Sequence, residues 1–426
     1  MSEQHESDGV VGRRGSAPVP RGRADTPDAP HLTVAVLTYR RNAYLAELLP
    51  VLLTQVDGVR ERVRPRVLVV DNDPRAGAAE VVSGAVGEPG RISPSYVHEA
   101  EPGIVAGRNR ALAECADEDL LVFIDDDEMP RSGWLAALLA AWREHGCAAV
   151  TGPTPPAYEK VPDDWVTASG AFDSWQADDG ARVTSADTGN LLLDLAVVRG
   201  LGLRFDPRYG LTGGEDSLFT RSLSLAGATI RFATGAVVDK RVAPERATRD
   251  WVLRRSFRAG SSWARVRVDT STGSRLPARL GYAAKGLARA GRDAVRAQAA
   301  RGRGDTAARA VHEVSCRGGL GMVVGAFGGR VLEYGREHHT VCVELAAALP
   351  HQLHRAHLQT ILCCAGRSHL VGQAAHFVEE PVGRSHRAPI HRHELVARLQ
   401  TNLGGGATLN DRVDARRQIG PTEHGH

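Results

Sequence analysis

Residues 119–128, DLLVFIDDDE, decide the fold class because they join an apolar run to four consecutive acids. Two earlier apolar runs, 31–37 (HLTVAVL) and 66–70 (RVLVV), also end in polar residues, and segments with helical spacing separate the runs. Strands that are apolar on both faces and alternate with helices predict a mostly parallel sheet in an α/β protein. Ligands of such sheets bind beyond the carboxyl ends of the strands, so we expect the functional site at this edge.

The composition indicates a folded protein without strong net charge. The chain has 426 residues, 42% hydrophobic and 24% charged, enough for one large domain with appendages. A net charge of +3 argues against nucleic-acid binding by bulk charge. The six cysteines form no CxxC pair, so we expect reduced thiols rather than a zinc site or disulfide framework. No apolar run reaches about 18 residues, so we expect a cytoplasmic protein without a membrane span.

Shifts in composition divide the chain into four segments. We expect a disordered leader at 1–30, without a signal peptide, and an α/β domain at 31–260, whose proline- and tryptophan-rich residues 151–190 form a lid. Residues 261–337 are basic with helical spacing, which predicts amphipathic helices suited to a membrane surface. The histidine-rich tail, 338–426, lacks both the pattern of a packed core and metal-ligand spacing.

The acidic cluster after the third apolar run is the sharpest chemical feature. Asp125, Asp126, Asp127 and Glu128 repel one another unless a cation or solvent relieves them, and their hard oxygen ligands suit Mg²⁺ or Mn²⁺. The alternative is a solvated acidic turn whose charge complements the dipole of the following helix.

A second acidic pair, Glu215 and Asp216, follows two glycines and opens a helical segment. A carboxylate held there would accept a proton from an acceptor hydroxyl as a general base. An N-cap with acids in the first turn has the same local pattern. A metal site in the same crevice would favour catalysis.

Four further polar residues become candidates for the functional site because we expect them at the same edge of the sheet. Thr38 and Arg40 follow the first strand, Asp71 ends the second, and Arg108 lies in the glycine-punctuated stretch 101–112. Asp71 would accept hydrogen bonds from a base or ribose, or form a turn, and Arg108 would reach a phosphate or solvent. We expect all four at the edge of the sheet where the acidic motifs lie.

Six stretches of the chain, in this order, resemble the family-2 glycosyltransferases, which have the GT-A fold. They are 34–55 (VAVLTYRRNAYLAELLPVLLTQ), 67–74 (VLVVDNDP), 101–112 (EPGIVAGRNRAL), 120–130 (LLVFIDDDEMP), 187–194 (DTGNLLLD) and 205–227 (FDPRYGLTGGEDSLFTRSLSLAG). The stretch 237–260 (VVDKRVAPERATRDWVLRRSFRAG) is similar to bacterial enzymes that build exopolysaccharide repeat units, such as succinoglycan-type glucosyltransferases.

The resemblance implies an inverting, metal-dependent sugar transfer from a nucleotide-diphosphate donor, with Mn²⁺ or Mg²⁺ as cofactor. The implied donor nucleotide site contains Thr38, Arg40, Asp71, Arg108 and Asp125. The implied metal ligands are Asp127 and Asp125. The implied catalytic base is Asp216, with Glu215 beside it.

The resemblance also implies an acceptor region, with Asn190, Gly214 and Trp165. Near the end of the sheet region, where the family often has an acid or a histidine, this chain has Asp239 and Lys240. Because of this departure, the resemblance implies no further metal ligand at these positions.

The implied partners are a nucleotide sugar, with a UDP-sugar as the first expectation, and a saccharide, lipid-linked or secondary-metabolite acceptor. Nucleic acid is not expected. Arg254, Arg255 and Arg258 would lie near a lipid-diphosphate acceptor on the inner face of the cell membrane, or on a solvated helix face.

Three other classes of protein fit parts of the pattern. A glycoside hydrolase also uses two carboxylates across a crevice, but it leaves the nucleoside residues unexplained. A nucleotidyltransferase also binds metal at aspartates after a strand, but it would carry a glycine-rich phosphate loop that residues 31–41 lack. An inactive scaffold of a polysaccharide assembly complex is the third, and replacing Asp127 or Asp216 would then leave the phenotype intact.

Overall fold

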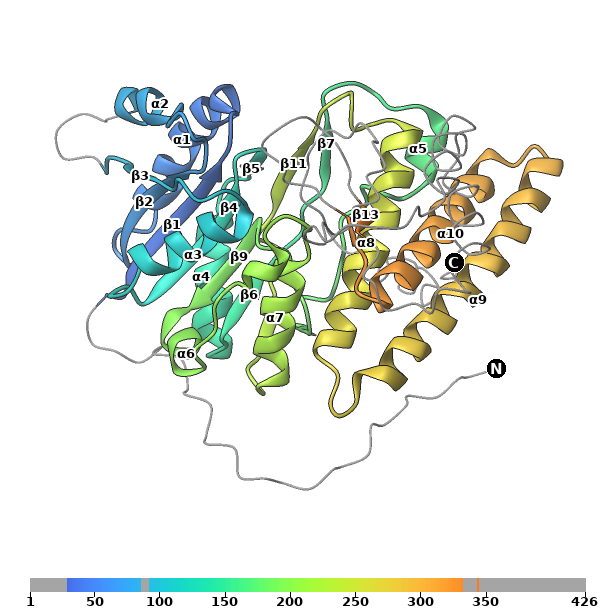
Figure 1. Ribbon diagram of the computed structural model, residues 1–426. Helices are drawn as coiled ribbons and strands as arrows, with labels where there is room; N and C mark the ends of the chain where they lie inside the picture. Colours follow the sequence, from blue (N-terminus) through green and yellow to red (C-terminus); the bar gives the residue numbers. More distant parts are fainter. Residues whose placement is uncertain (1–28, 86–91, 332–342, 345–426) are drawn as a thin grey trace, which may run out of the picture.

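A sheet flanked by helices lies beside a layer of three long helices in the computed structural model, which describes residues 29–85, 92–331 and 343–344 (Figure 1). The strands of the main sheet, in spatial order, are β3 (Ser95–His98), β2 (Arg64–Asp71), β1 (His31–Thr38), β4 (Leu120–Asp125), β9 (Asn190–Asp194), β6 (Ala149–Thr151), β10 (Ile230–Phe232) and β8 (Arg182–Val183). Neighbours from β3 to β4 are parallel, whereas β9 lies antiparallel between β4 and β6. The predicted α/β class with a mixed, mostly parallel sheet is confirmed.

Side-chain alternation explains why both faces of this sheet carry helices. In β1, Val34 and Val36 point to one face, Ala35 and Leu37 point to the other, and all four are buried. The helices that cover the first face are α1 (Asn42–Asp57), α2 (Ala79–Gly84) and α4 (Trp134–His145). The helices that cover the second are α3 (Ile104–Glu114), α6 (Leu195–Gly200) and α7 (Glu215–Leu225). With both faces covered, a ligand reaches the sheet at its carboxyl edge.

A second sheet lies beyond the carboxyl end of β4. Its strands, in order, are β5 (Glu128–Pro130), β11 (Val238–Val242) and β7 (Pro156–Tyr158). Residues 228–242 do not form one continuous strand, because β10 and β11 lie in different sheets. A turn separates them, because the Thr234 N–H donates to Asp179 over 2.7 Å and the Ala236 N–H donates to the Ala233 carbonyl over 3.1 Å.

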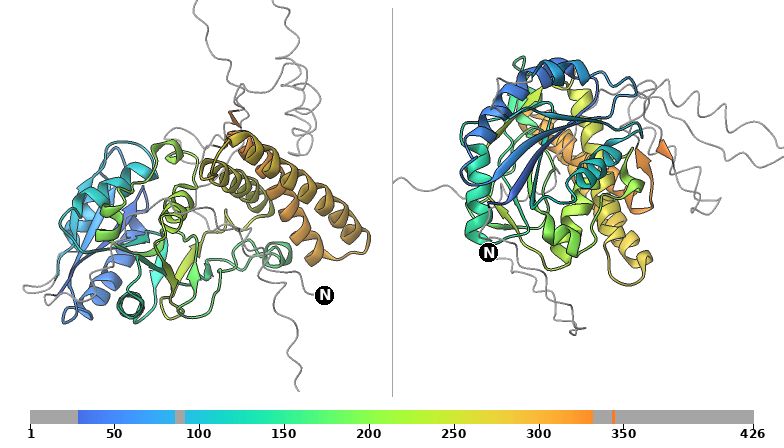
Figure 2. Two further views of the ribbon diagram at one scale, coloured as in Figure 1. Left: turned by 90° about the horizontal axis from the view of Figure 1, so that it is seen from below. Right: turned by 90° about the vertical axis from the view of Figure 1, so that its left-hand side faces the viewer.

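The helical layer consists of α8 (Arg249–Asp269), α9 (Arg275–Gly302) and α10 (Thr306–Ala326), of which α10 packs against the other two (Figure 2). Glycines permit this packing, because a Cβ on Gly321 would strike the Phe257 carbonyl oxygen and one on Gly325 would strike the Ser261 carbonyl. The glycine-rich part of α10 therefore serves helix packing. Across the ranges that the structure describes, no helix is both long and apolar enough to cross a membrane.

The expected boundary at residue 260 falls inside α8, so one continuous helix joins the two expected segments. The expected lid, 151–190, contains β7, β8 and the short helix α5 (Asp164–Ala168), which packs on α10. The expected leader lies almost wholly, and the tail mostly, outside the described residues, so both expectations stay predictions.

Candidate active site

Pairing between β1 and its two neighbours gathers the predicted strand-end residues. Leu37 lies opposite Asp125 of β4, and Thr38 lies opposite Asp71 of β2. The Asp71 carboxylate is buried and accepts hydrogen bonds from the backbone N–H groups of Asp73 (2.8 Å) and Ala78 (2.9 Å) and from the Tyr96 hydroxyl (3.1 Å). Asp71 therefore shapes the turn after β2, and its predicted contact with the donor stays a prediction.

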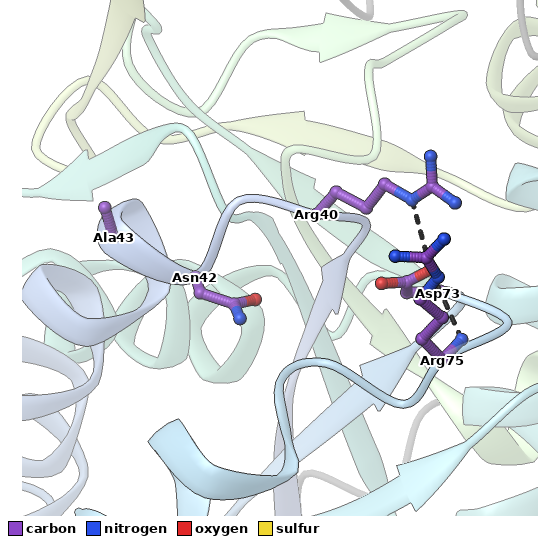
Figure 3. A pocket seen from close by; sticks show the side chains of 5 residues that line it. All are labelled: Arg40, Asn42, Ala43, Asp73 and Arg75. Atoms are coloured by element: carbon purple, nitrogen blue, oxygen red, sulfur yellow. Dashed lines mark hydrogen bonds and ion pairs between the residues drawn. The ribbon is translucent and has the colours of Figure 1, made fainter.

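A polar cavity of about 510 Å³ opens between the ends of β1 and β2 (Figure 3). It is lined by Arg40, Asn42, Ala43, Asp73 and Arg75. The Arg40 Nε donates to an Asp73 carboxylate oxygen over 3.1 Å, and Arg40 has a positive φ of 56°, a region that non-glycine residues rarely adopt. Two guanidinium groups against one carboxylate give this cavity a net positive charge, which suits an anionic ligand.

Protein cations hold the acidic cluster at the end of β4. Asp126 accepts hydrogen bonds from the Thr38 hydroxyl (2.9 Å) and from Arg41 Nη1 (2.7 Å). Asp127 lies 3.1 Å from the same Arg41 nitrogen and 2.9 Å from Arg246 Nη1. Thr38 thus positions an acid, while its predicted contact with the nucleoside stays untested.

The third cation of the cluster, Lys240, lies between two carboxylates. Its Nζ is 2.8 Å from Glu128 Oε1 and 3.6 Å from Asp125 Oδ2. The backbone N–H of Asp125 also donates to Glu128 over 3.2 Å. A Cβ on Gly189 would collide with the Glu128 carboxylate, so the glycine leaves the space that this acid occupies.

Burial and cations act in opposite directions on the acids of this cluster. Burial raises the pKa of Asp126 to about 6 and that of Glu128 to about 8, although Arg41 and Lys240 respectively act against the shift. Burial also disfavours the Asp127 carboxylate, but Arg41, Lys240 and Arg246 together lower its pKa to about 2. Asp127 is therefore the acid of the cluster that stays ionised most firmly.

As folded, the cluster does not fit a divalent cation. Its four carboxylates already face Arg41, Lys240 and Arg246, which leave one formal negative charge rather than four. Among the residues that the structure describes, no three His, Cys, Asp or Glu side chains are grouped so as to hold a metal ion. A metal at Asp126, Asp127 or Glu128 would have to displace hydrogen-bonded cations from carboxylates that are almost fully buried.

The cations of the cluster are more exposed than most of its acids. The side chains of Asp126, Asp127 and Glu128 are at most 4% exposed, whereas those of the three cations are 11% to 26% exposed. Asp125 is the exception, at 22%. The three cations and Asp125 are therefore the groups of the cluster that solvent reaches most.

Glu215 and Asp216 begin α7, behind a glycine turn that requires positive φ angles of 73° at Gly213 and 91° at Gly214. Burial raises the pKa of Asp216, Arg108 opposes this shift, and the charge of Asp125 adds to it. Asp216 is therefore close enough to Asp125 for their charges to interact, which links the two acidic motifs electrostatically.

Arg108, which was expected at the nucleotide, pairs instead with Glu215 in a buried ion pair. Its guanidinium also lies 5.6 Å from the centroid of the Phe205 ring. In the structure Arg108 therefore supports the Glu215–Asp216 motif from α3, and its predicted approach to the nucleotide stays untested.

Two of the expected acceptor residues lie inside the protein. The Asn190 side chain is 1% exposed, accepts a hydrogen bond from the Trp134 indole (2.8 Å) and donates one to the Ala236 carbonyl (2.7 Å). Trp165 is 7% exposed and donates to Glu313 of α10 over 3.1 Å. The structure does not bring either side chain to the crevice, whereas Gly214 lies directly beside Glu215.

Arg255, expected near a lipid-diphosphate acceptor, is also buried. It donates to the Ala171 carbonyl over 2.6 Å and stacks near Phe172 and Trp251. This arginine therefore ties the 151–190 segment to α8.

The sequence predictions do not include Arg41 and Arg246 among the site residues. Arg41 directly follows a predicted site residue, and this adjacency is a signal that would have found it. Arg246 follows β11 and lies 119 residues from Asp127 along the chain, so local pattern contains no sign of their contact.

Comparison with known proteins identifies the class of enzyme. The model of glycosyl transferase family 2 matches residues 33–190. The succinoglycan biosynthesis protein ExoM of Rhizobium meliloti (strain 1021) is 36% identical over 250 residues, which are 58% of this chain and 78% of ExoM. The pre-mycofactocin glycosyltransferase of Mycobacterium tuberculosis (strain ATCC 25618 / H37Rv) is 31% identical over 179 residues, 39% of this chain and 35% of that protein.

Among solved structures, the mannosyltransferase PcManGT from Pyrobaculum calidifontis, in complex with GDP-Man and Mn²⁺, is 18% identical. The match covers 72% of this chain and 89% of that chain, with a TM-score of 0.46.

The chain belongs to glycosyl transferase family 2, because its match to ExoM covers more than two thirds of that protein at 36% identity. It is a glycosyltransferase, and the predicted resemblance is confirmed. The hydrolase and nucleotidyltransferase alternatives are set aside by this membership.

Proposed function

We propose that this protein is an inverting glycosyltransferase that moves a sugar from a nucleoside diphosphate to a hydroxyl group of a saccharide or lipid-linked acceptor. The observation that carries the proposal is the buried Asp216 carboxylate at the start of α7, whose charge interacts with that of Asp125. A base at this position borders the crevice in which the donor would bind, as a single displacement requires.

The reaction follows from the position of this base. The acceptor hydroxyl attacks the anomeric carbon from the face opposite the leaving group, and its proton passes to Asp216. The new carbon–oxygen bond forms as the bond to phosphate breaks, and the electron pair leaves with the nucleoside diphosphate. One displacement inverts the configuration, so an α-linked donor gives a β-linked product. The raised pKa of Asp216 makes it a stronger base than an exposed aspartate.

The cavity beside Arg40 is our proposed site for the donor nucleoside. Its arginines and Asp73 offer both donors and an acceptor to a nucleobase and ribose, and it adjoins the acidic cluster through the consecutive residues Arg40 and Arg41. UDP-sugars are the first donors to test. Similarity to ExoM, a succinoglycan biosynthesis protein, supports an exopolysaccharide-type acceptor.

The sequence also predicts Mn²⁺ or Mg²⁺ as the counter-charge for the leaving diphosphate. Because the cluster as folded does not fit such an ion, no step of the proposed mechanism depends on it.

We further propose that α9 lies on an anionic lipid surface. Four large apolar side chains on this helix, at 276, 280, 287 and 295, are 55% to 72% exposed, and their spacing places them along one side. Lys285, Arg289, Arg292 and Arg296 follow one another at helical spacing along another side of the same helix. A helix with an apolar side and a basic side suits the interface of a membrane with anionic headgroups.

The membrane proposal is tested by cosedimentation with vesicles. The wild-type protein should pellet with phosphatidylglycerol vesicles and much less with phosphatidylcholine vesicles, and Leu287→Asp should weaken this binding. Leu225→Asp is the matched control, because Leu225 of α7 and Leu287 are both 58% exposed. Equal effects of the two substitutions, or no binding by the wild type, would refute the assignment to α9.

The transfer itself is tested with a panel of UDP-, GDP- and dTDP-sugars and saccharide acceptors. Release of nucleoside diphosphate measures turnover, and NMR of the product gives its anomeric configuration. Inversion by the wild type, with turnover lost in Asp216→Asn, is expected. Retention of configuration or a fully active Asp216→Asn would contradict the mechanism, and a folded wild type inactive with every donor would support the scaffold alternative.

A further inference from the structure

Three cations from separate parts of the chain converge on the acidic cluster. Arg41 directly precedes α1, Lys240 lies in the middle of β11, and Arg246 belongs to the loop between β11 and α8. Each makes at least one contact of 3.1 Å or less with a carboxylate of the cluster. These contacts are between groups far apart in the chain, so the fold itself builds this charged surface.

The backbone fixes the position of Lys240. In the antiparallel pair of β5 and β11, Lys240 lies directly opposite Glu128. The next residue, Arg241, donates its backbone N–H to the Asp127 carbonyl over 2.8 Å, which ties β11 to the cluster. The ammonium group of Lys240 is thus held within 3.6 Å of Asp125, the most exposed acid of the four.

We infer that Lys240 and Arg246, assisted by Arg41, supply the positive charge at the donor diphosphate that a divalent cation would otherwise supply. This inference rests on the proposed function and deepens it by naming the groups that stabilise the leaving diphosphate. As the bond between sugar and phosphate breaks, negative charge grows on the departing phosphate oxygen. Fixed ammonium and guanidinium groups stabilise such charge without reorganising.

The partial exposure of the three cations matches this role. The side chains of the cations are 11% to 26% exposed and those of three of the acids at most 4%, so a diphosphate that approaches the cluster meets positive charge first. The acids beneath hold the cations in place before the donor arrives, which lowers the cost of ordering them. A divalent cation at Asp127 would have to compete with Arg41 and Arg246 for the same carboxylate oxygen.

The first experiment measures metal and nucleotide binding separately on the full chain. Mn²⁺ alone is titrated with the protein and followed by its EPR signal, and UDP, GDP and dTDP are titrated by calorimetry in EDTA and then in Mn²⁺. We expect no binding of Mn²⁺ at micromolar concentrations and the same affinity for the preferred nucleotide in both buffers. Tight Mn²⁺ binding, or a nucleotide that binds only with Mn²⁺, would overturn the inference while leaving the proposed function intact. Failure of all three nucleotides to bind would overturn both.

A charge-matched variant tests the role of Lys240. Lys240→Gln combined with Glu128→Gln removes one cation and one acid, so no uncompensated charge stays buried. We expect this variant to bind the nucleotide about 10- to 100-fold more weakly in EDTA, the value of a hydrogen bond to a charged group. Arg301→Gln, at an exposed position near the end of α9, is the control. An unchanged affinity in a folded double variant would refute the role of Lys240.

Discussion

The pKa values of two buried acids at the edge of the sheet and of one buried acid in the helical layer are shifted in opposite directions. At the sheet edge, burial raises the pKa of Asp126 to about 6 and that of Glu128 to about 8. In the helical layer, burial also opposes ionisation of Asp293, but hydrogen bonds from Arg292 and Ser315 lower its pKa. The layer therefore gains stability from the charge of Asp293, whereas the sheet edge, apart from Asp127, holds Asp126 and Glu128 where their charged forms are disfavoured, as functional sites commonly do.

The largest effect is expected from Asp216→Asn. The amide is nearly isosteric but accepts no proton at neutral pH, so turnover should fall by about 10²–10⁴-fold, the usual contribution of a general base. Since burial disfavours the charge of Asp216, the melting temperature should not decrease. Steady-state rates and a thermal melt check both statements. The exposed Asp178→Asn is the control and should alter neither.

The pH dependence of turnover gives the next largest effect. The base must be ionised, and its pKa is raised, so activity should fall as the pH decreases through a value above the ordinary aspartate range of about 3.9. Well below that value the rate should drop about tenfold per pH unit. The positive charge of Arg108 lowers the pKa of Asp216, and lysine keeps that charge, so Arg108→Lys should shift the acidic limb of the profile only slightly. A profile flat down to about pH 4 would contradict Asp216 as the base.

Two glycine substitutions should separate packing from backbone propensity in the helical layer. Gly321→Ala places a methyl group against the Phe257 carbonyl and should destabilise the protein by about 1–3 kcal/mol. Gly291→Ala on α9 meets open space and should stabilise it by about 0.5–1 kcal/mol. Urea unfolding measures both changes. Equal effects would show that α10 does not pack as closely as described.

A smaller and pH-dependent effect is expected from Asp293→Asn. Because the pKa of Asp293 is lowered in the folded state, its contribution to stability is complete above about pH 4 and is lost as the pH falls further. The substitution should therefore cost about 1–2 kcal/mol at pH 7 and much less at about pH 3. Urea unfolding at the two pH values tests this. If the loss of stability in Asp293→Asn were the same at both pH values, Asp293 would stabilise the layer by packing and hydrogen bonding rather than by its charge.

The sequence predicted those parts of the protein that depend on local pattern. Continuous apolar runs identified β1, β2 and β4, because a strand buried on both faces needs apolar side chains on both. Local pattern also placed the acids at 125–128 after a strand and the start of α7 at Glu215, because strand ends and helix starts have their own residue preferences.

What the sequence did not predict depends on contacts between distant segments. The partners of Asp127 are Arg41 and Arg246, which lie 86 and 119 residues away along the chain, and no pattern near Asp127 names them. Likewise, the break between β10 and β11 is made by a turn that Asp179 holds from another segment. Long-range pairing, rather than propensity, decided these features.

The hydrogen bond between Trp165 and Glu313 has a consequence for synthesis of the protein. The two residues are 148 positions apart, so α5 leaves the ribosome long before its partner helix exists. At about 5–20 residues per second this delay is roughly 7–30 s. In the last part of that interval every strand of the main sheet has been synthesised, because β10 ends at Phe232, while the indole of Trp165 still has no Glu313 to bind. We therefore expect a chaperone that binds exposed aromatic side chains to contact the α5 segment during translation.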